Sequence, residues 1–134
     1  MPEMLELEVA TPERLLVRES VDEVQVPGKD GYMGILPGHA ALLGQLGTGF
    51  LSYTAGGRTR FLSVRGGFVE VLPDHVRVLA NSAERAEDID LQRARDELKK
   101  AHEESVNPAV GVDPAIALEA LAWAQARVQA AEQK

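Results

Sequence analysis

The sequence of 134 residues contains no cysteine, which excludes disulfides, thiolate catalysis and cysteine-ligated metal sites. Aromatic residues make up only 4% of the chain, too few for the stacking platforms that bind bases or sugars. The formal net charge of −7, without a basic cluster, argues against nucleic acid as a partner. No run approaches about 18 consecutive apolar residues, and the first residues lack the pattern of a secretory signal.

Motifs for catalysis and metal binding are also missing. His39, His75 and His102 lie far apart in the sequence, without the paired spacing of a metal-binding helix. The sequence holds neither a phosphate-binding P-loop nor a serine nucleophile elbow. Gly47 and Gly49 begin like a dinucleotide fingerprint, but the third glycine is absent. We therefore expect no catalytic residue, no metal ligand and no required cofactor.

Glycine and alanine divide the chain into two regions. Eleven of the 12 glycines lie at or before Gly67, whereas alanine becomes frequent after Ala83. Glycine favours turns and alanine favours helices. The sequence therefore predicts an α+β protein. An N-terminal antiparallel β-sandwich, or flattened barrel, would occupy residues 1–84, and a C-terminal antiparallel helical hairpin would occupy residues 85–134.

Short stretches of alternating polarity predict strands in the first region. Gly56 and Gly57 make a good hairpin turn, because both can take positive φ without steric cost. Pro73 and Asp74 mark a second tight turn. The expected strands cover residues 5–9, 23–26, 49–54, 59–64, 68–72 and 75–79.

Capping residues and apolar spacing predict two helices in the second region. Asp88 or Asp90 can cap the first helix, since a carboxylate accepts hydrogen bonds from free N–H groups. Asp113, followed by Pro114, is a typical start for the second. Narrow apolar stripes and a short loop predict antiparallel helices that pack on each other. The stripe of the first helix contains Leu91, Ala94, Leu98 and Ala101.

Three stretches stand out from this background, and each has a plain structural explanation. Residues 34–40, Gly-Ile-Leu-Pro-Gly-His-Ala, are typical of a turn with His39 partly exposed. The pair Gly66 and Gly67 indicates a bulge or a close approach of two backbones. Residues 84–94 are consistent with a linker followed by a helix cap, with Arg93 facing water.

In this order, the three stretches resemble the epsilon subunit of bacterial F-type ATP synthases. The resemblance covers almost the whole chain and implies a β-sandwich followed by a helical hairpin. It implies a non-catalytic subunit at the foot of the central rotor stalk, peripheral to the cytoplasmic face of the bacterial plasma membrane through the complex. It also implies two roles, which are coupling of proton flow to ATP synthesis and restraint of ATP hydrolysis.

The resemblance implies three kinds of partner. The gamma subunit would contact residues 34–43, with contacts expected at Ile35, Leu36, Pro37, His39 and Leu42. The c ring would approach the preceding loop, with contacts expected at Lys29, Asp30, Gly31, Tyr32 and Met33. Tyr32 stands where several relatives carry an acidic residue. The alpha and beta subunits would be reached when the hairpin is extended.

Some relatives bind ATP on the folded hairpin through an Ile/Leu-Asp-x-x-Arg-Ala motif, which residues 89–94 match. The implied ATP-binding residues are Glu84, Ile89, Asp90, Arg93, Ala94, Lys100 and Arg127. Lys100 and Trp123 stand where such relatives carry arginines, and Trp123 would either stack on the ligand or pack the two helices. ATP is thus implied as a regulatory ligand, although a capping role for Asp90 also explains the motif.

The alanine-rich second helix predicts a hairpin that is only modestly held against the sandwich. Alanine favours the helix but buries little area when the helix docks. Two other classes of protein explain the sequence less well. A carbohydrate-binding sandwich with a helical tail needs exposed aromatic rings, and a small hydrolase needs a nucleophile or a metal pattern.

Overall fold

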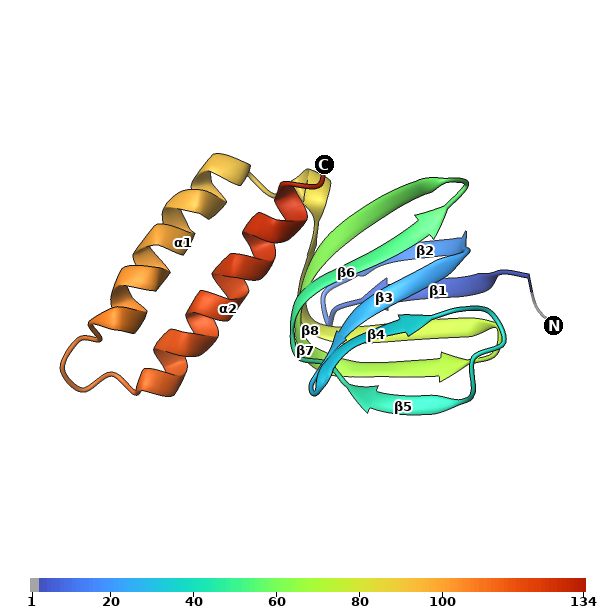
Figure 1. Ribbon diagram of the computed structural model, residues 1–134, viewed down its shortest axis with the longest axis horizontal. Helices are drawn as coiled ribbons and strands as arrows, with labels where there is room; N and C mark the ends of the chain where they lie inside the picture. Colours follow the sequence, from blue (N-terminus) through green and yellow to red (C-terminus); the bar gives the residue numbers. More distant parts are fainter. Residues whose placement is uncertain (1–2) are drawn as a thin grey trace.

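Alternating side chains give the first strand, β1 (Leu5–Ala10), two different faces. Leu5, Leu7 and Val9 are fully buried, and the residues between them are half-buried. The computed structural model describes residues 3–134, in which a β-sandwich is followed by two helices (Figure 1). The predicted order of a sandwich and then a helical hairpin is confirmed.

One hydrogen-bonded sheet forms the sandwich by folding over on itself (Figure 1). Its order is β2-β1-β8-β7-β6-β3-β4, with β5 paired to β7. Of the strand pairs within residues 3–134, β1 and β8 run parallel and the others antiparallel. The remaining strands are β2 (Leu15–Val21), β3 (Glu23–Gly28), β4 (Gly31–Ile35), β5 (Leu42–Gln45), β6 (Thr48–Ala55), β7 (Arg58–Leu72) and β8 (His75–Arg85).

Both predicted hairpin turns are present. Gly56 and Gly57 join β6 to β7 with φ angles of 58° and 79°. The two strands expected on either side of Gly66 and Gly67 form one continuous strand, β7. A Cβ atom at Gly67 would lie 2.0 Å from the carbonyl oxygen of Leu79, so the predicted close approach of two backbones is confirmed.

Branched aliphatic side chains fill the space between the layers of the sandwich. Each such side chain contributes about 1.5–3 kcal/mol when it leaves water. This core therefore makes the sandwich the stable part of the molecule. Its fully buried members include Leu5, Leu7, Val9, Val21, Val24, Val26, Ile35, Leu51, Leu62, Val64 and Val69.

A short 3-10 turn, η1 (Ala86–Asp88), leads from β8 into α1 (Leu91–Val106), and α2 (Pro114–Ala131) follows. Of the two predicted caps for α1, Asp90 is the one used, because its Oδ1 accepts from the backbone N–H of Arg93 at 3.2 Å. Asp113 caps α2 in the same way, as predicted.

The helices form a hairpin beside the sandwich, with α2 as the inner helix (Figure 1). α2 packs on β6 and β7, and α1 packs on α2. Within residues 3–134, neither helix is long and apolar enough to cross a membrane. Because α2 lies between α1 and the sandwich, the contact between sandwich and hairpin is formed mainly by one face of α2.

Candidate functional site

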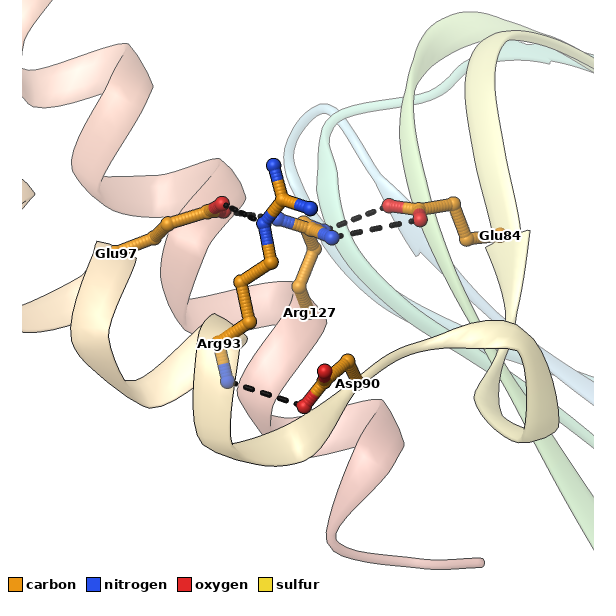
Figure 2. A network of polar contacts seen from close by, with 5 residues as sticks. All are labelled: Glu84, Asp90, Arg93, Glu97 and Arg127. Atoms are coloured by element: carbon orange, nitrogen blue, oxygen red, sulfur yellow. Dashed lines mark hydrogen bonds and ion pairs between the residues drawn. The ribbon is translucent and has the colours of Figure 1, made fainter.

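One arginine joins the sandwich to both helices (Figure 2). Arg127 of α2 donates from Nε to Glu84 Oε1 at 2.7 Å and from Nη2 to Glu84 Oε2 at 3.5 Å. Its Nη1 donates to Glu97 of α1. The Arg127 side chain is only 17% exposed. A single guanidinium thus connects the end of β8, α1 and α2.

Burial and the neighbouring carboxylates act on Arg127 in opposite directions. Burial by itself would lower the pKa of the guanidinium. The hydrogen bond to Glu84 and the charges of Glu84 and Glu97 outweigh burial and raise the pKa above its ordinary value. Arg127 therefore stays charged, and its forked contact with Glu84 combines a short hydrogen bond from Nε with a long one from Nη2.

Part of the predicted ATP-binding set lies in the same network. Arg93 donates from Nε to Glu97 Oε1 at 3.1 Å, and its side chain is 76% exposed. Asp90 caps α1 next to it (Figure 2). This arrangement matches the plain explanation of the motif, which is a helix cap with Arg93 facing water.

The other predicted members of the set lie outside the network. Ile89 and Ala94 are each only 1% exposed and belong to an apolar cluster, so their side chains are unavailable to a ligand. Lys100 is exposed on α1. The structure therefore brings together four of the seven residues, namely Glu84, Asp90, Arg93 and Arg127.

A second polar contact holds the other part of α2 against the sandwich. The Glu119 carboxylate lies 3.2 Å from Nε of Arg65 on β7 and accepts from Oγ1 of Thr48 on β6 at 2.9 Å. The Arg65 guanidinium lies 5.7 Å from the centre of the Trp123 ring. Neither role predicted for Trp123 includes this contact with the sandwich.

Glu119, Trp123 and Arg127 are spaced four residues apart, so they lie on one face of α2. We call these three residues the docking stripe, because each contacts the sandwich. The sequence shows this spacing, but spacing alone does not predict which residues of the sandwich the three side chains contact. The docking stripe is therefore polar and aromatic rather than purely alanine.

An apolar cluster completes the contact near the last turn of α2. Phe61 of β7 packs against this cluster. Its buried members are small except for Ile89. They are Ile89, Ala94, Val128, Ala130 and Ala131.

The stretch predicted to face the gamma subunit is partly exposed. Leu36 and Leu42 are 59% and 39% exposed, and Pro37 and His39 are half-buried. Ile35 differs from the rest of the stretch, because its side chain is only 1% exposed. The alternation of β4 directs it into the core, where it pairs in register with Val24.

This stretch borders an exposed apolar surface that the sequence did not reveal. The N–H of Gly38 donates to the carbonyl oxygen of Pro73 at 2.7 Å and ties the stretch to the β7–β8 turn. Four apolar side chains on β5, β7 and β8 are between 39% and 72% exposed. We call them the outer patch: Leu43, Phe68, Leu72 and Leu79.

In the loop predicted to approach the c ring, Lys29, Asp30 and Gly31 are exposed. Tyr32 lies back on β6, where its hydroxyl accepts from the N–H of Phe50 at 3.2 Å and its ring centre lies 4.9 Å from that of Phe50. Met33 packs against the core of the sandwich. The turn between β3 and β4 is thus the most accessible part of this set.

Residues 3–134 contain no group of three or more histidine or acidic side chains that could hold a metal ion. The candidate functional features described above are contact surfaces: the docking stripe with its carboxylate partners, the outer patch, and the β3–β4 turn.

The family model for the ATP synthase delta/epsilon chain β-sandwich domain matches residues 4–86. The ATP synthase epsilon chain of Solibacter usitatus (strain Ellin6076) is 63% identical over 134 residues, with all of both chains covered. A chain in the OSCP, F1 and c-ring structure of the Euglena gracilis mitochondrial ATP synthase has a TM-score of 0.82 and 26% identity. That match covers 98% of this chain and 83% of the other.

A chain in the central stalk and c-ring structure of the Tetrahymena thermophila mitochondrial ATP synthase has a TM-score of 0.56. It covers 96% of this chain and 93% of the other, and at 14% identity it supports the fold alone. The full-length relative and the family model agree on the sandwich, and the hairpin is included in the full-length match. The chain therefore belongs to the delta/epsilon family of ATP synthase subunits, as an epsilon chain.

Proposed function

We propose that this non-catalytic subunit sits in the central stalk of a proton-translocating ATP synthase and restrains ATP hydrolysis through its hairpin. The observation that carries the proposal is the polar docking stripe, which holds a separate helical unit against a rigid sandwich. A helix held by ion pairs and a small apolar cluster can leave without disturbing the core. The sandwich would stay on the rotor while the hairpin changes position.

The outer patch supports docking of the sandwich on the gamma subunit. Exposed apolar side chains that gather on one face typically mark an interaction site. In the outer patch, Phe68 and Leu79 face each other across β7 and β8. The structural neighbours come from assemblies described with a c ring, so a stalk subunit is the partner that this surface would meet. Leu36, Pro37, His39 and Leu42 would form its border.

Binding to purified gamma subunit tests this interface. We expect Leu79→Glu to weaken binding at least about tenfold, because it places a charge in the centre of an apolar contact. Val110→Glu is the matched control, since Val110 is fully exposed at the hairpin turn, away from the outer patch. Equal binding by Leu79→Glu and the unmodified chain would exclude this face as the gamma surface.

The β3–β4 turn is the proposed contact with the c ring. Lys29 and Asp30 project at its tip, and the ring of Tyr32 is held by Phe50. The contact would therefore use the charged tip more than the aromatic ring. Crosslinking of Asp30→Cys to the c ring in the assembled enzyme tests the contact, with Asp74→Cys in the β7–β8 turn as the control.

Restraint of hydrolysis would require the hairpin to leave the sandwich and extend toward the alpha and beta subunits. The assay is ATP hydrolysis by the reconstituted catalytic head, with the full chain and with a chain that ends after Asp88. We expect the shortened chain to bind gamma but to relieve the inhibition. Equal hydrolysis rates with both chains would contradict an inhibitory hairpin.

A role in sensing ATP is supported by the convergence of Glu84, Asp90, Arg93 and Arg127 at one end of the hairpin (Figure 2). Arg93 and Arg127 are the residues that would hold phosphates. Because Glu84 and Glu97 already engage Arg127, phosphates would have to replace carboxylates. ATP would then act as a regulatory ligand of the docked hairpin.

Isothermal titration of the full chain with ATP at millimolar concentration tests this role. We expect Glu97→Gln to strengthen binding, because it frees one side of the Arg127 guanidinium, and Arg127→Gln to abolish it. Arg95→Gln is the control, since Arg95 pairs with Glu132 instead. No heat from the unmodified chain and from Glu97→Gln would exclude ATP sensing at this network.

A further inference from the structure

The docking face of the sandwich contains a buried hydroxyl group. Ser63 lies in β7 and is 0% exposed. Its Oγ has no hydrogen-bond partner anywhere in residues 3–134. Buried side-chain hydroxyls in proteins are almost always hydrogen-bonded, so this atom requires an explanation.

Strand alternation directs the Ser63 side chain toward α2. Leu62 and Val64 point into the sandwich core. Phe61 and Arg65, on the opposite face of β7, contact the apolar cluster and Glu119 of the hairpin. Ser63 lies between Phe61 and Arg65 on that same face, beneath the docked helix.

The groups around Ser63 explain why its hydroxyl is unpaired. Its cross-strand neighbours in register are Phe50 and Glu84. Phe50 offers no acceptor, and the Glu84 carboxylate is engaged by Arg127. Main-chain carbonyls within a helix already accept bonds from their own helix. The buried face of α2 is mostly alanine, at Ala117, Ala124, Ala126, Ala130 and Ala131.

We propose that burial of the Ser63 hydroxyl weakens docking of the hairpin and so sets how readily α2 leaves the sandwich. When α2 departs, water reaches the hydroxyl and satisfies it. When α2 returns, that hydration is lost without a replacement. The unpaired hydroxyl thus opposes the docking stripe and the apolar cluster, and keeps the docked and released states closer in free energy.

Replacement of the hydroxyl by a methyl group tests the inference in the isolated full chain. We expect Ser63→Ala to slow hydrogen exchange of the α2 amides about tenfold, the change that about 1.4 kcal/mol of tighter docking produces. Amides of β1 should exchange as before, because the core is untouched. Equal or faster exchange in α2 would overturn the proposal.

Ser52→Ala is the matched control. Ser52 lies on the adjacent strand β6, faces the same side as Ser63, and is 9% exposed. It lines a groove of about 400 Å³ together with Phe50 and Phe61. We expect no change in α2 exchange for Ser52→Ala. A slowing equal to that of Ser63→Ala would mean that any serine-to-alanine change on this face tightens docking, and would also overturn the proposal.

A role for the balance between docked and released hairpin in controlling ATP hydrolysis rests on the proposed function. The exchange experiment measures docking alone and needs no partner subunit. If Ser63→Ala slows exchange but leaves inhibition in the reconstituted head unchanged, the inhibitory hairpin is wrong and the account of Ser63 stands. If exchange is unchanged, the account of Ser63 fails whatever the hydrolysis assay gives.

Discussion

The sandwich and the hairpin are held together by different kinds of contact. The core of the sandwich consists mainly of leucine, isoleucine and valine, and many of these side chains have no exposed surface. The hairpin buries mainly alanine, and it meets the sandwich through the docking stripe and the small cluster around Phe61. One chain thus combines a unit fixed by apolar volume with a unit attached by polar contacts.

This difference fits the two roles proposed for the subunit, which are transmission of torque by the sandwich and restraint of ATP hydrolysis by the hairpin. Torque can pass through a sandwich whose core has one close-packed arrangement. A regulatory arm needs two positions of similar free energy, and ion pairs with a few small apolar contacts provide a modest docking energy. Changes in the core and changes in the docking contacts are therefore expected to affect one unit and spare the other.

The sandwich core should be the most sensitive part of the chain. Leu51 of β6 is fully buried, so Leu51→Ala removes apolar contacts and leaves a cavity. We expect it to lower the free energy of unfolding by about 2–5 kcal/mol in a urea titration. Leu118→Ala on α2, where the side chain is 59% exposed, should change it by less than about 0.5 kcal/mol. Similar losses for both would remove the contrast between the units.

High pH should also weaken the sandwich. Burial raises the pKa of Tyr53 to about 12, and the nearby charge of Glu19 adds to the effect. The unfolded chain ionises this phenol near pH 10, so it loses the proton before the folded chain does. Stability should therefore fall as pH rises from about 10, by about 2–3 kcal/mol by pH 12.

Tyr53→Phe isolates that contribution from other groups that titrate at high pH. We expect the unfolding free energy of the unmodified chain, measured in urea, to fall more steeply than that of Tyr53→Phe from about pH 10 to about pH 12. Parallel curves would show that the phenol does not titrate differently in the two states.

The Arg127 network should control the hairpin more than the sandwich. Arg127→Ala removes three hydrogen bonds and leaves Glu84 and Glu97 without their shared cation. We expect the docking free energy to fall by about 1–2 kcal/mol. The loss is smaller than for a buried ion pair, because both carboxylates are partly exposed. Trp123 is the sole tryptophan of the chain, so its fluorescence and quenching by acrylamide report the release of α2.

Arg93→Ala is the control for this network. Arg93 contacts the same Glu97, but its side chain is 76% exposed, so the expected loss is below about 0.5 kcal/mol. An equal increase in Trp123 quenching for both variants would mean that burial of Arg127 contributes nothing to docking.

Salt should have the smallest effect. The pair between Glu119 and Arg65 is partly exposed, so screening at about 1 M sodium chloride should weaken docking by about 0.2–1 kcal/mol. Glu119→Gln should make Trp123 quenching less dependent on salt, because the pair has already lost one charge. An unchanged salt dependence in Glu119→Gln would assign the effect to other charges.

Local sequence patterns predicted most of the fold. Alternation located β1, β3, β6, β7 and β8, but it did not predict β2, β4 or β5. Gly56 and Gly57 gave the correct turn, and Asp90 and Asp113 cap the two helices. Pairing between distant strands was not predictable from such patterns. β1 and β8, the first and last strands in the chain, pair in parallel, and their register depends on the whole core.

The contact surfaces were predicted less completely, because exposure depends on which elements cover a residue. Ile35 lies in a motif that resembles a gamma contact, yet its place in β4 directs it into the core. Trp123 was assigned to a ligand or to α1, whereas Arg65 lies across from it. The outer patch became apparent only when the pairing of β5, β7 and β8 was known.

Native-state hydrogen exchange of the unmodified full chain compares the strength of hairpin docking with the stability of the sandwich. The rigid sandwich and the weakly docked hairpin should separate into two groups of amides. We expect amides of residues 114–131 to exchange through release of the hairpin, at a free energy well below that of the buried strands of the sandwich. Equal protection of α2 and of the sandwich core would contradict the account, because the hairpin would then open only when the whole molecule unfolds.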